Sequence, residues 1–393
     1  MQTQIRQEKG STNAQNIERN SQSTTLAPTS RLQSLDTLRG FDMFWISGGD
    51  KFIHVLADVT GWGWSLILAE QFTHVYWNGF HAYDLIFPLF LFLAGVSTPF
   101  SLGSRLQKGV SPNQLIRKVV QRGIILVLLG ILYNNGLFKT EWATMRYPSV
   151  LGRIGLAGMF AQIIYLYSSR RTQYIWFGSL LIGYWLIIQF VPVPGCGAGL
   201  ITPECNPATY LDKTLLPGRM YNSTYDPVGI LSTLPAISTG LLGIFAGNLL
   251  LTNEQTMPKS RKALWLALSG IICLGTALLW NTVFPINKIL WSSPFVLLTG
   301  GFSLLLLALF YTIIDVLNWR RLTSFFIVIG MNSIVIYMIG KFIDFRYTSN
   351  ALFGGFLSFF SEPVQALGSV VATIAVLWGF MYFLYRQKLF LKL

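Results

Sequence analysis

The residues best suited to chemistry in this chain are its three histidines, His54, His74 and His81, which all fall between positions 54 and 81. The stretch THVYWNGFHAYDLIF contains two of them and places Asp84 at the start of a long apolar run. Imidazole titrates near neutral pH and is the commonest general base in enzymes. Position alone leaves two interpretations of His74, a catalytic base or a structural histidine, and the structural role is the more frequent one.

The run that follows Asp84 is one of about ten apolar segments, each near the 20 residues that a helix needs to cross ~30 Å of hydrocarbon. Charged residues make up only 11% of the chain, against about 25% in soluble proteins. We therefore predict an all-α polytopic membrane protein with about ten transmembrane helices. The predicted spans are roughly 38–57, 82–102, 115–135, 149–167, 174–192, 228–252, 262–284, 293–316, 323–343 and 364–385. The first is the weakest, because Asp42, Asp50 and Lys51 interrupt it.

The distribution of lysine and arginine predicts the orientation of these spans. Alternate connecting segments hold most of the 29 basic residues, and such segments face the cytoplasm. Both termini are therefore predicted to be cytoplasmic. The net charge of +13 follows from this bias, together with contact with anionic lipid headgroups. We expect the lipid bilayer as a partner and no binding of nucleic acid.

The N-terminal residues and the cysteines give further predictions about the organisation of the chain. Residues 1–30, rich in Gln, Ser, Thr and Asn, are predicted to be a disordered cytoplasmic tail, followed by a transmembrane domain at 31–393. The tail has no apolar core of a signal peptide, so we expect the first span to act as a signal anchor. Cys196 and Cys205 share one predicted outer loop, where a disulfide is favoured over two free thiols. No spacing resembles a metal site.

In this orientation the histidines lie on the first outer loop or at its membrane edges, together with other polar and aromatic groups. A carboxylate such as Asp84 at the end of a span is costly and normally has a partner or a function. The mixture of groups suits binding of a carbohydrate, although ordinary solvation explains any single member equally well. The candidate residues for binding an acceptor are Trp77, Asn78, Arg153, Asp226, Asn287 and Lys288.

The predicted inner face has a polar group of its own in RLQSLDTLRG. Asp36 and Arg39 lie there at the mouth of the first span, where the acid can instead complement the helix dipole with Arg39 at i+3. Asn332 lies deep in the ninth span and is expected to face a polar interior. The polar residues therefore mark two faces and a path between them.

Six motifs, in one order, resemble the transmembrane N-acetyltransferases of the heparan-α-glucosaminide N-acetyltransferase type. They are SLDTLRG, HVYWNGFHAYDLIFPLFLFLAG, LGRIGL, YDPVGILSTLPAISTGLLGIFAG, INKILWSSPF and GMNSIVIYM. The similarity covers the chain from residue 31 onward, and the number and order of the motifs make it specific. The resemblance leads us to expect that the luminal domain and the additional span of the animal enzymes have no counterpart here. The resemblance therefore suggests a compact bacterial form in the inner membrane.

The resemblance implies transfer of the acetyl group from cytoplasmic acetyl-CoA to a glucosamine amine on the other side. The essential histidine of the family precedes Trp-Asn-Gly by three residues, which makes it His74 here; His81 inherits no role. Asp84 is the best candidate to orient the imidazole. The family also has an asparagine near the end of the first span, where this chain offers Ser47 or Asp50 as substitutes. A homodimer is suggested as well.

Coenzyme A has a diphosphate and a 3′-phosphate, which require Arg or Lys on the cytoplasmic side. The candidates for cofactor binding are Arg31, Ser34, Asp36, Arg39, Arg117, Lys118, Arg122 and Asn332. His74 is expected to act as a general base in direct transfer, with an acetyl-histidine intermediate as the alternative. No metal is expected.

Two other functions remain open. One is a transporter of amino sugars, although no clear internal repeat is present and the polar groups gather near the faces. The other is an O-acyltransferase for a surface or cell-wall glycan, because the same base activates a hydroxyl. A structural scaffold gives no reason for the histidine cluster. The sequence does not identify the acceptor.

Overall fold

The computed structural model describes residues 32–137, 139, 141–321 and 323–391. Residues Gln33–Leu393 form one compact unit, and the predicted tail at 1–30, like Arg31, lies outside the described residues. Throughout the described part the chain is helical, and its β-structure is limited to two isolated bridges, Arg146–Gly218 and Val193–Gly197. The predicted all-α class is therefore confirmed.

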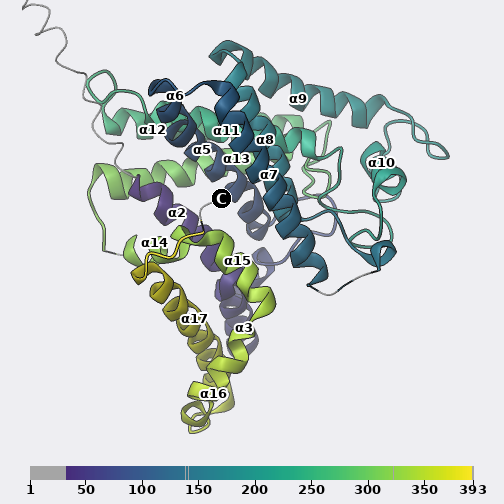
Figure 1. Cartoon of the computed structure of the whole chain (residues 1–393). Helices are drawn as coiled ribbons and strands as arrows, with labels where there is room; N and C mark the ends of the chain where they lie inside the picture. Colours follow the sequence, from purple (N-terminus) through teal and green to yellow (C-terminus); the bar gives the residue numbers. More distant parts are fainter. Residues whose placement is uncertain (1–31, 138, 140, 322, 392–393) are drawn as a thin grey trace, which may run out of the picture. The chain divides into compact units, whose positions relative to one another are not determined.

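Long helices form the body of this unit, and some of the shorter ones, such as α10 and α16, lie at its edges (Figure 1). The long ones are α5 (Ile86–Thr98, within the helical segment Ala82–Gln107), α7 (Pro112–Asn135), α8 (Val150–Tyr167), α9 (Arg170–Phe190), α11 (Thr233–Leu250), α12 (Lys259–Trp280), α13 (Ser293–Tyr311) and α17 (Glu362–Arg386). The others are α2 (Gln33–Phe44), α3 (Asp50–Thr60), α4 (Gly63–Gln71), α6 (Ser104–Gln107), α10 (Pro207–Leu215), α14 (Thr323–Met331), α15 (Ser333–Phe342) and α16 (Phe345–Leu357).

Each of the ten predicted spans coincides with helix. Among the described residues, seven helices are long and apolar enough to cross a membrane, and the pair α14 and α15, bent by 69°, makes up to eight. The predicted first and third spans correspond to α2–α3 and α7, whose charged residues lower their hydropathy. Membrane-crossing helices are thus confirmed, whereas the number ten and the cytoplasmic termini stay predictions.

Helices α5 and α11 approach one another more closely than any side chain allows. A Cβ atom on Gly95 would lie 2.2 Å from the carbonyl oxygen of Gly240, and one on Gly243 would lie 2.1 Å from that of Phe92. Small residues at such crossings let membrane helices pack backbone against backbone. This contact fixes the position of α5, whose preceding turn contains Asp84.

Two helix breaks place further residues of interest. The first separates α2 from α3, where a π-helical turn at Trp45–Gly49 contains Gly48 with φ of 131°. Because positive φ strongly favours glycine, the chain turns there and Asp50 begins α3. The second break, at Asn332, separates α14 from α15. The Asn332 amide donates to the Leu389 carbonyl at 3.0 Å and accepts from the Leu391 N–H at 3.3 Å.

The α5–α11 crossing leads to a stability prediction. Gly95→Ala should destabilise the fold by about 1–3 kcal/mol, because overpacking forces two backbones apart. The matched control is Gly275→Ala in α12, where a Cβ would meet nothing within 4 Å. The control should be neutral or slightly stabilising, since alanine favours helix over glycine. Thermal unfolding of the purified protein in one detergent compares the two; equal melting temperatures would contradict the proposed close packing.

Candidate active site

His74 lies in the loop between α4 and α5, with its imidazole bonded to a buried carboxylate. Its Nδ1 is 2.8 Å from Oδ1 of Asp84, and the Asp84 side chain is 1% exposed. The other carboxylate oxygen accepts the backbone N–H of His81 at 3.1 Å. A carboxylate on Nδ1 keeps the hydrogen of the neutral ring on that nitrogen, so the lone pair remains on Nε2.

Lys288, from the loop between α12 and α13, joins this pair. Its Nζ is 3.0 Å from Oδ1 of Asp84 and 2.9 and 3.2 Å from Nδ1 and Nε2 of His74. Because Nδ1 donates to Asp84, the ammonium group can donate only to Nε2 of the ring. Burial lowers the pKa of Lys288, and the Asp84 charge opposes this effect. Lys288, a candidate for acceptor binding, therefore belongs to a cluster with His74 and Asp84.

The other two histidines hold the backbone that leads into His74. Nε2 of His54 is 3.3 Å from the carbonyl oxygen of Phe72, and Nδ1 of His81 is 3.2 Å from that of Thr73. The clustering of histidines in the sequence thus has a structural explanation for two of the three. It is consistent with giving catalysis to His74 and not to His81.

A cavity of about 440 Å³, hereafter the outer cavity, opens beside the cluster. His74 and Lys288 lie on its wall, and the remainder consists mainly of aliphatic residues and five tyrosines. Aromatic rings with a few polar groups are typical of pockets that bind small polar ligands. Its polar and aromatic wall residues are His74, Tyr76, Tyr83, Phe87, Arg146, Tyr221, Tyr225, Lys288, Trp291 and Tyr337.

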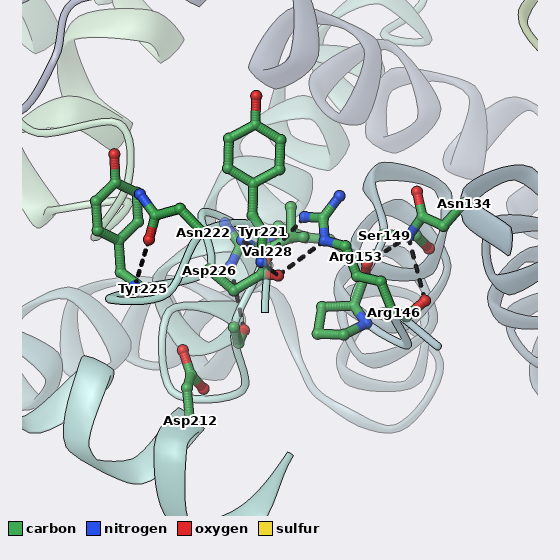
Figure 2. Close-up of polar contacts among 12 residues, drawn as sticks. Asn134, Arg146, Ser149, Arg153, Asp212, Tyr221, Asn222, Tyr225, Asp226 and Val228 are labelled. Carbon is green, nitrogen blue, oxygen red and sulfur yellow. Dashed lines mark hydrogen bonds and ion pairs between the residues drawn. The ribbon is translucent and has the colours of Figure 1, made fainter. Parts of the chain in front are cut away.

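Arg146 is a wall residue that the sequence did not single out. It forms a two-pronged ion pair with Asp226, at 2.9 Å from Nε and 2.8 Å from Nη2 (Figure 2). Its guanidinium also lies 4.9 Å from the centre of the Tyr221 ring. Asp226 is buried behind this arginine and does not line the outer cavity. Any contact of Asp226 with a ligand would therefore act through Arg146.

Arg153 is buried beneath the cavity. It donates to the carbonyl of Gly229 at 3.1 Å and to the hydroxyl of Ser232, and its guanidinium lies 5.0 Å from the Trp291 ring centre. The negative charge of Asp212 helps to balance the charge of Arg153. Burial raises the pKa of Asp212 to about 6, against the hydrogen bond from the Ile230 N–H. Arg153 thus supports a wall residue, Trp291, from behind.

Three further acceptor candidates join loops to one another. The indole N–H of Trp77 donates to the Ile201 carbonyl at 2.9 Å, within the loop closed by the disulfide Cys196–Cys205. The Asn287 amide donates to Oδ1 of Asn78 at 3.0 Å. None of the three lines the outer cavity. Asn78 and Asn287 hold the His74 loop against the Lys288 loop, and Trp77 holds it against the disulfide loop. The favoured disulfide is present.

A second cavity, of about 410 Å³ and hereafter the inner cavity, lies near the far end of the segment Ala82–Gln107. That segment has 26 residues and is about 40 Å long at 1.5 Å per residue. Lys118 and Arg122 of the predicted cofactor set line the inner cavity, as does Arg105, which the sequence analysis left out of that set. The other lining residues are Ser101, Leu102, Val119, Gln121, Ile125 and Gln162.

The remaining cofactor candidates lie elsewhere. Arg39 bonds to Asp36 at 3.2 Å and to the Ser97 hydroxyl at 2.8 Å, and its charge acts on Arg122. Ser34 is buried, and Arg117 does not line the inner cavity. The Asn332 amide is occupied by the segment at 389–391.

Two small voids, of about 40 and 20 Å³, lie between the cavities. The larger shares Ile46 and Tyr337 with the outer cavity. The smaller shares Arg122 with the inner cavity, and Ile154 lines both voids. The cavities and voids therefore form a series along α5, α7 and α8. Among the described residues, no group of three or more His, Cys, Asp or Glu is placed to hold a metal ion.

Comparison with known proteins identifies the family. The family model described as heparan-alpha-glucosaminide N-acetyltransferase, catalytic, matches residues 31–284. The chain is 30% identical to the heparan-alpha-glucosaminide N-acetyltransferase of Homo sapiens, over 92% of this chain and 60% of that protein. The Mus musculus protein of the same name is 29% identical, over 94% of this chain and 62% of that protein. The chain thus spans about three-fifths of the length of these relatives, and it belongs to the heparan-alpha-glucosaminide N-acetyltransferase catalytic family.

Proposed function

We propose that this protein is a membrane-embedded acetyltransferase, which moves the acetyl group of cytoplasmic acetyl-CoA to the amine of an amino sugar at the outer face. The observation that carries this proposal is the His74, Asp84 and Lys288 cluster on the wall of the outer cavity. Family membership supports the same reaction class, because the relatives are named as N-acetyltransferases.

His74 is the general base in this mechanism. Its Nε2 removes a proton from the acceptor amine while the amine nitrogen attacks the thioester carbonyl carbon. The carbon–nitrogen bond forms, the carbon–sulfur bond breaks, and the imidazolium returns the proton to the departing thiolate. Asp84 holds the ring in the required tautomer and stabilises the imidazolium during the transfer. Direct transfer needs no acetylated protein.

Lys288 has two tasks in this mechanism. In the resting site its ammonium lies 3.2 Å from Nε2 of His74. There it prevents other hydrogen-bond donors from binding to this nitrogen. When the amine occupies that position, the ammonium stays attached to Asp84 and faces the reacting carbonyl. A cation at this point stabilises the negative charge that develops on the carbonyl oxygen.

The outer cavity holds the acceptor. Its tyrosines offer flat faces and hydroxyl groups to a sugar ring. Arg146 adds a cation that Asp226 fixes in place. These features suit a sugar ring, and the amine of the proposed acceptor follows from the names of the relatives.

The inner cavity holds the phosphates of acetyl-CoA. Arg105, Lys118 and Arg122 supply three cations on its wall, which suits a diphosphate and a 3′-phosphate. The two small voids mark the route by which the thioester, at the end of the flexible pantetheine arm, reaches His74. Acetyl-CoA and sugar thus approach from opposite faces, as the charge bias of the loops predicts.

A transporter of amino sugars is the second candidate, because the bent pair α14 and α15 is the kind of interrupted helix that transporters use. The acid–base cluster beside the outer cavity favours the enzyme, since a transporter has no need for a base oriented by a carboxylate. O-acyl transfer uses the same base on a hydroxyl group. Product chemistry separates these functions.

The first prediction concerns the base. His74→Ala should lower kcat for acetyl-CoA-dependent acetylation of glucosamine by about 10²–10⁴-fold, the usual contribution of a general base. The KM for acetyl-CoA should change little, because its phosphates bind at the inner cavity. His81→Gln, which removes only a support of the loop, should cost less than tenfold. The rate of CoA release by the purified His74→Ala and His81→Gln proteins measures both effects.

Three results would contradict this assignment. Glucosamine flux into vesicles without consumption of acetyl-CoA would favour the transporter. An alkali-labile ester product in place of an amide would favour O-acyl transfer. Accumulation of acetylated protein when labelled acetyl-CoA is mixed with enzyme without acceptor would replace direct transfer by an acetyl-histidine route.

The second prediction concerns pH. Lys288 acts as the ammonium form, and its pKa is lowered from 10.5 by burial. Activity should therefore fall as pH rises through a value below 10.5, because the cation is lost there. Lys288→Arg should move this alkaline limb to higher pH, and Lys288→Met should lower kcat at all pH values. Lys139→Met, which lies outside the outer cavity lining, is the control. An alkaline limb unchanged in Lys288→Arg would remove Lys288 from the mechanism.

The third prediction concerns the donor. Arg105→Gln and Lys118→Gln should each raise the KM for acetyl-CoA about tenfold and leave kcat nearly unchanged, since each loses one charged phosphate contact worth about 1.4 kcal/mol. Arg320→Gln, on a predicted cytoplasmic segment but outside the inner cavity lining, should not affect it. An equal rise in all three variants would indicate a general surface-charge effect and would count against this phosphate site.

A further inference from the structure

One face of the His74 imidazole is covered by the ring of Tyr83. The two ring centres are 4.9 Å apart and the planes are inclined by 33°. Tyr83 belongs to the short 3₁₀ turn Ala82–Leu85, which also contains Asp84. One turn therefore supplies both the carboxylate at the edge of the imidazole and the aromatic ring against its face.

Tyr83 is itself held from the other side. Its hydroxyl donates to Oδ2 of Asp50 at 3.2 Å, and Asp50 is the first residue of α3, directly after the helix break at Gly48. The second carboxylate oxygen of Asp50 is buried and has no hydrogen-bond partner within the described ranges. Tyr83 thus contacts both Asp50, at the break in the first predicted span, and His74, the candidate base.

The imidazole needs such a contact for a geometric reason. The hydrogen bond from Nδ1 to Asp84 fixes one point of the ring, but the ring can still tilt about that bond. A proton transfer requires Nε2 to point at the amine, and small errors of orientation are costly in rate. A neighbouring aromatic ring against the face blocks the tilt, and its bonded hydroxyl keeps that neighbour in place.

The same geometry decides between two residues that the sequence leaves open as helpers of the base. Ser47 donates its hydroxyl to the Met43 carbonyl at 2.7 Å, within its own helix. Ser47 does not line the outer cavity. Asp50 reaches Tyr83, and Tyr83 lines that cavity.

We propose that Tyr83 and Asp50 are a positioning pair for His74, in which Asp50 holds the phenol and the phenol ring holds the imidazole. Its effect on catalysis rests on the proposed function, whereas the physical contact does not. Two experiments therefore test the pair, one independent of activity and one kinetic.

The first experiment uses the full chain with histidine labelled at ¹³Cε1, and follows the three imidazole resonances by NMR. His74→Gln assigns the His74 signal by its loss. Tyr83→Leu should move that signal downfield, because the shielding of the aromatic ring disappears. Tyr83→Phe, which keeps the ring and loses only the bond to Asp50, should move it in the same direction but less far, about as far as Asp50→Ala. Asp50→Ala should move it in the same direction as Tyr83→Leu, and Asp50→Asn, which keeps an acceptor oxygen, should move it less.

Ser47→Ala is the matched control, and the signals of His54 and His81 are internal references. The His74 signal should not move in Ser47→Ala, and the His54 and His81 signals should not move in any of these variants. A His74 signal that is unchanged in Tyr83→Leu, or that moves as far in Ser47→Ala as in Asp50→Ala, would overturn the pair. Movement of all three histidine signals together would mean general unfolding and would equally count against it.

The second experiment measures rates. Tyr83→Leu should lower kcat about tenfold with the KM for acetyl-CoA unchanged, and Tyr83→Phe, which keeps the ring but loses the bond to Asp50, should lose less, about as much as Asp50→Ala alone. Adding Asp50→Ala to Tyr83→Leu should cost nothing more, since both act through one contact. Additive losses would refute the pair. If the wild type acetylates no amine while its His74 signal responds as described, the proposed function fails and the positioning pair stands.

Discussion

The candidate site depends on one buried charge. The Asp84 carboxylate is 1% exposed at the start of a membrane-crossing helix, where an ionised group without partners would be very costly. Its two oxygens are satisfied by a backbone N–H, an imidazole and an ammonium group. These donors come from segments far apart in the sequence. The need to pair one carboxylate thus brings the base and the cation together.

The sequence predicts the helical framework well. The thickness of the hydrocarbon layer sets the length of each membrane-crossing helix, and a run of about 20 apolar residues is visible in the sequence. It also singles out His74 and Asp84, which are ten positions apart within one motif. It cannot reveal that Lys288 meets them, because that contact spans 214 residues. Nor can it separate residues that contact ligand from residues that join loops, since both kinds are polar. Trp77, Asn78 and Asn287 were therefore predicted to bind the acceptor, yet their side chains bond to neighbouring loops.

Arg146, Arg105 and Tyr83 illustrate a second limit. Each is ordinary in its local sequence, and each gains its place only through packing of distant helices. Arg146 lines the outer cavity because Asp226 holds it there. Arg105 lines the inner cavity beside residues of α7. The two cavities lie toward opposite ends of one long helical segment. Under the proposed function, the phosphate groups of acetyl-CoA therefore stay outside the apolar interior, where their desolvation would be prohibitive.

The bend at Asn332 has a practical consequence. Both ends of its amide are bonded to the backbone of Leu389 and Leu391, while Tyr337 on the following helix borders the outer cavity and the larger void. A purification tag or reporter protein joined close behind Leu391 would pull on this attachment. The disturbance would reach the outer cavity and the larger void through Tyr337, so labels are better placed at the other end of the polypeptide or behind a long spacer.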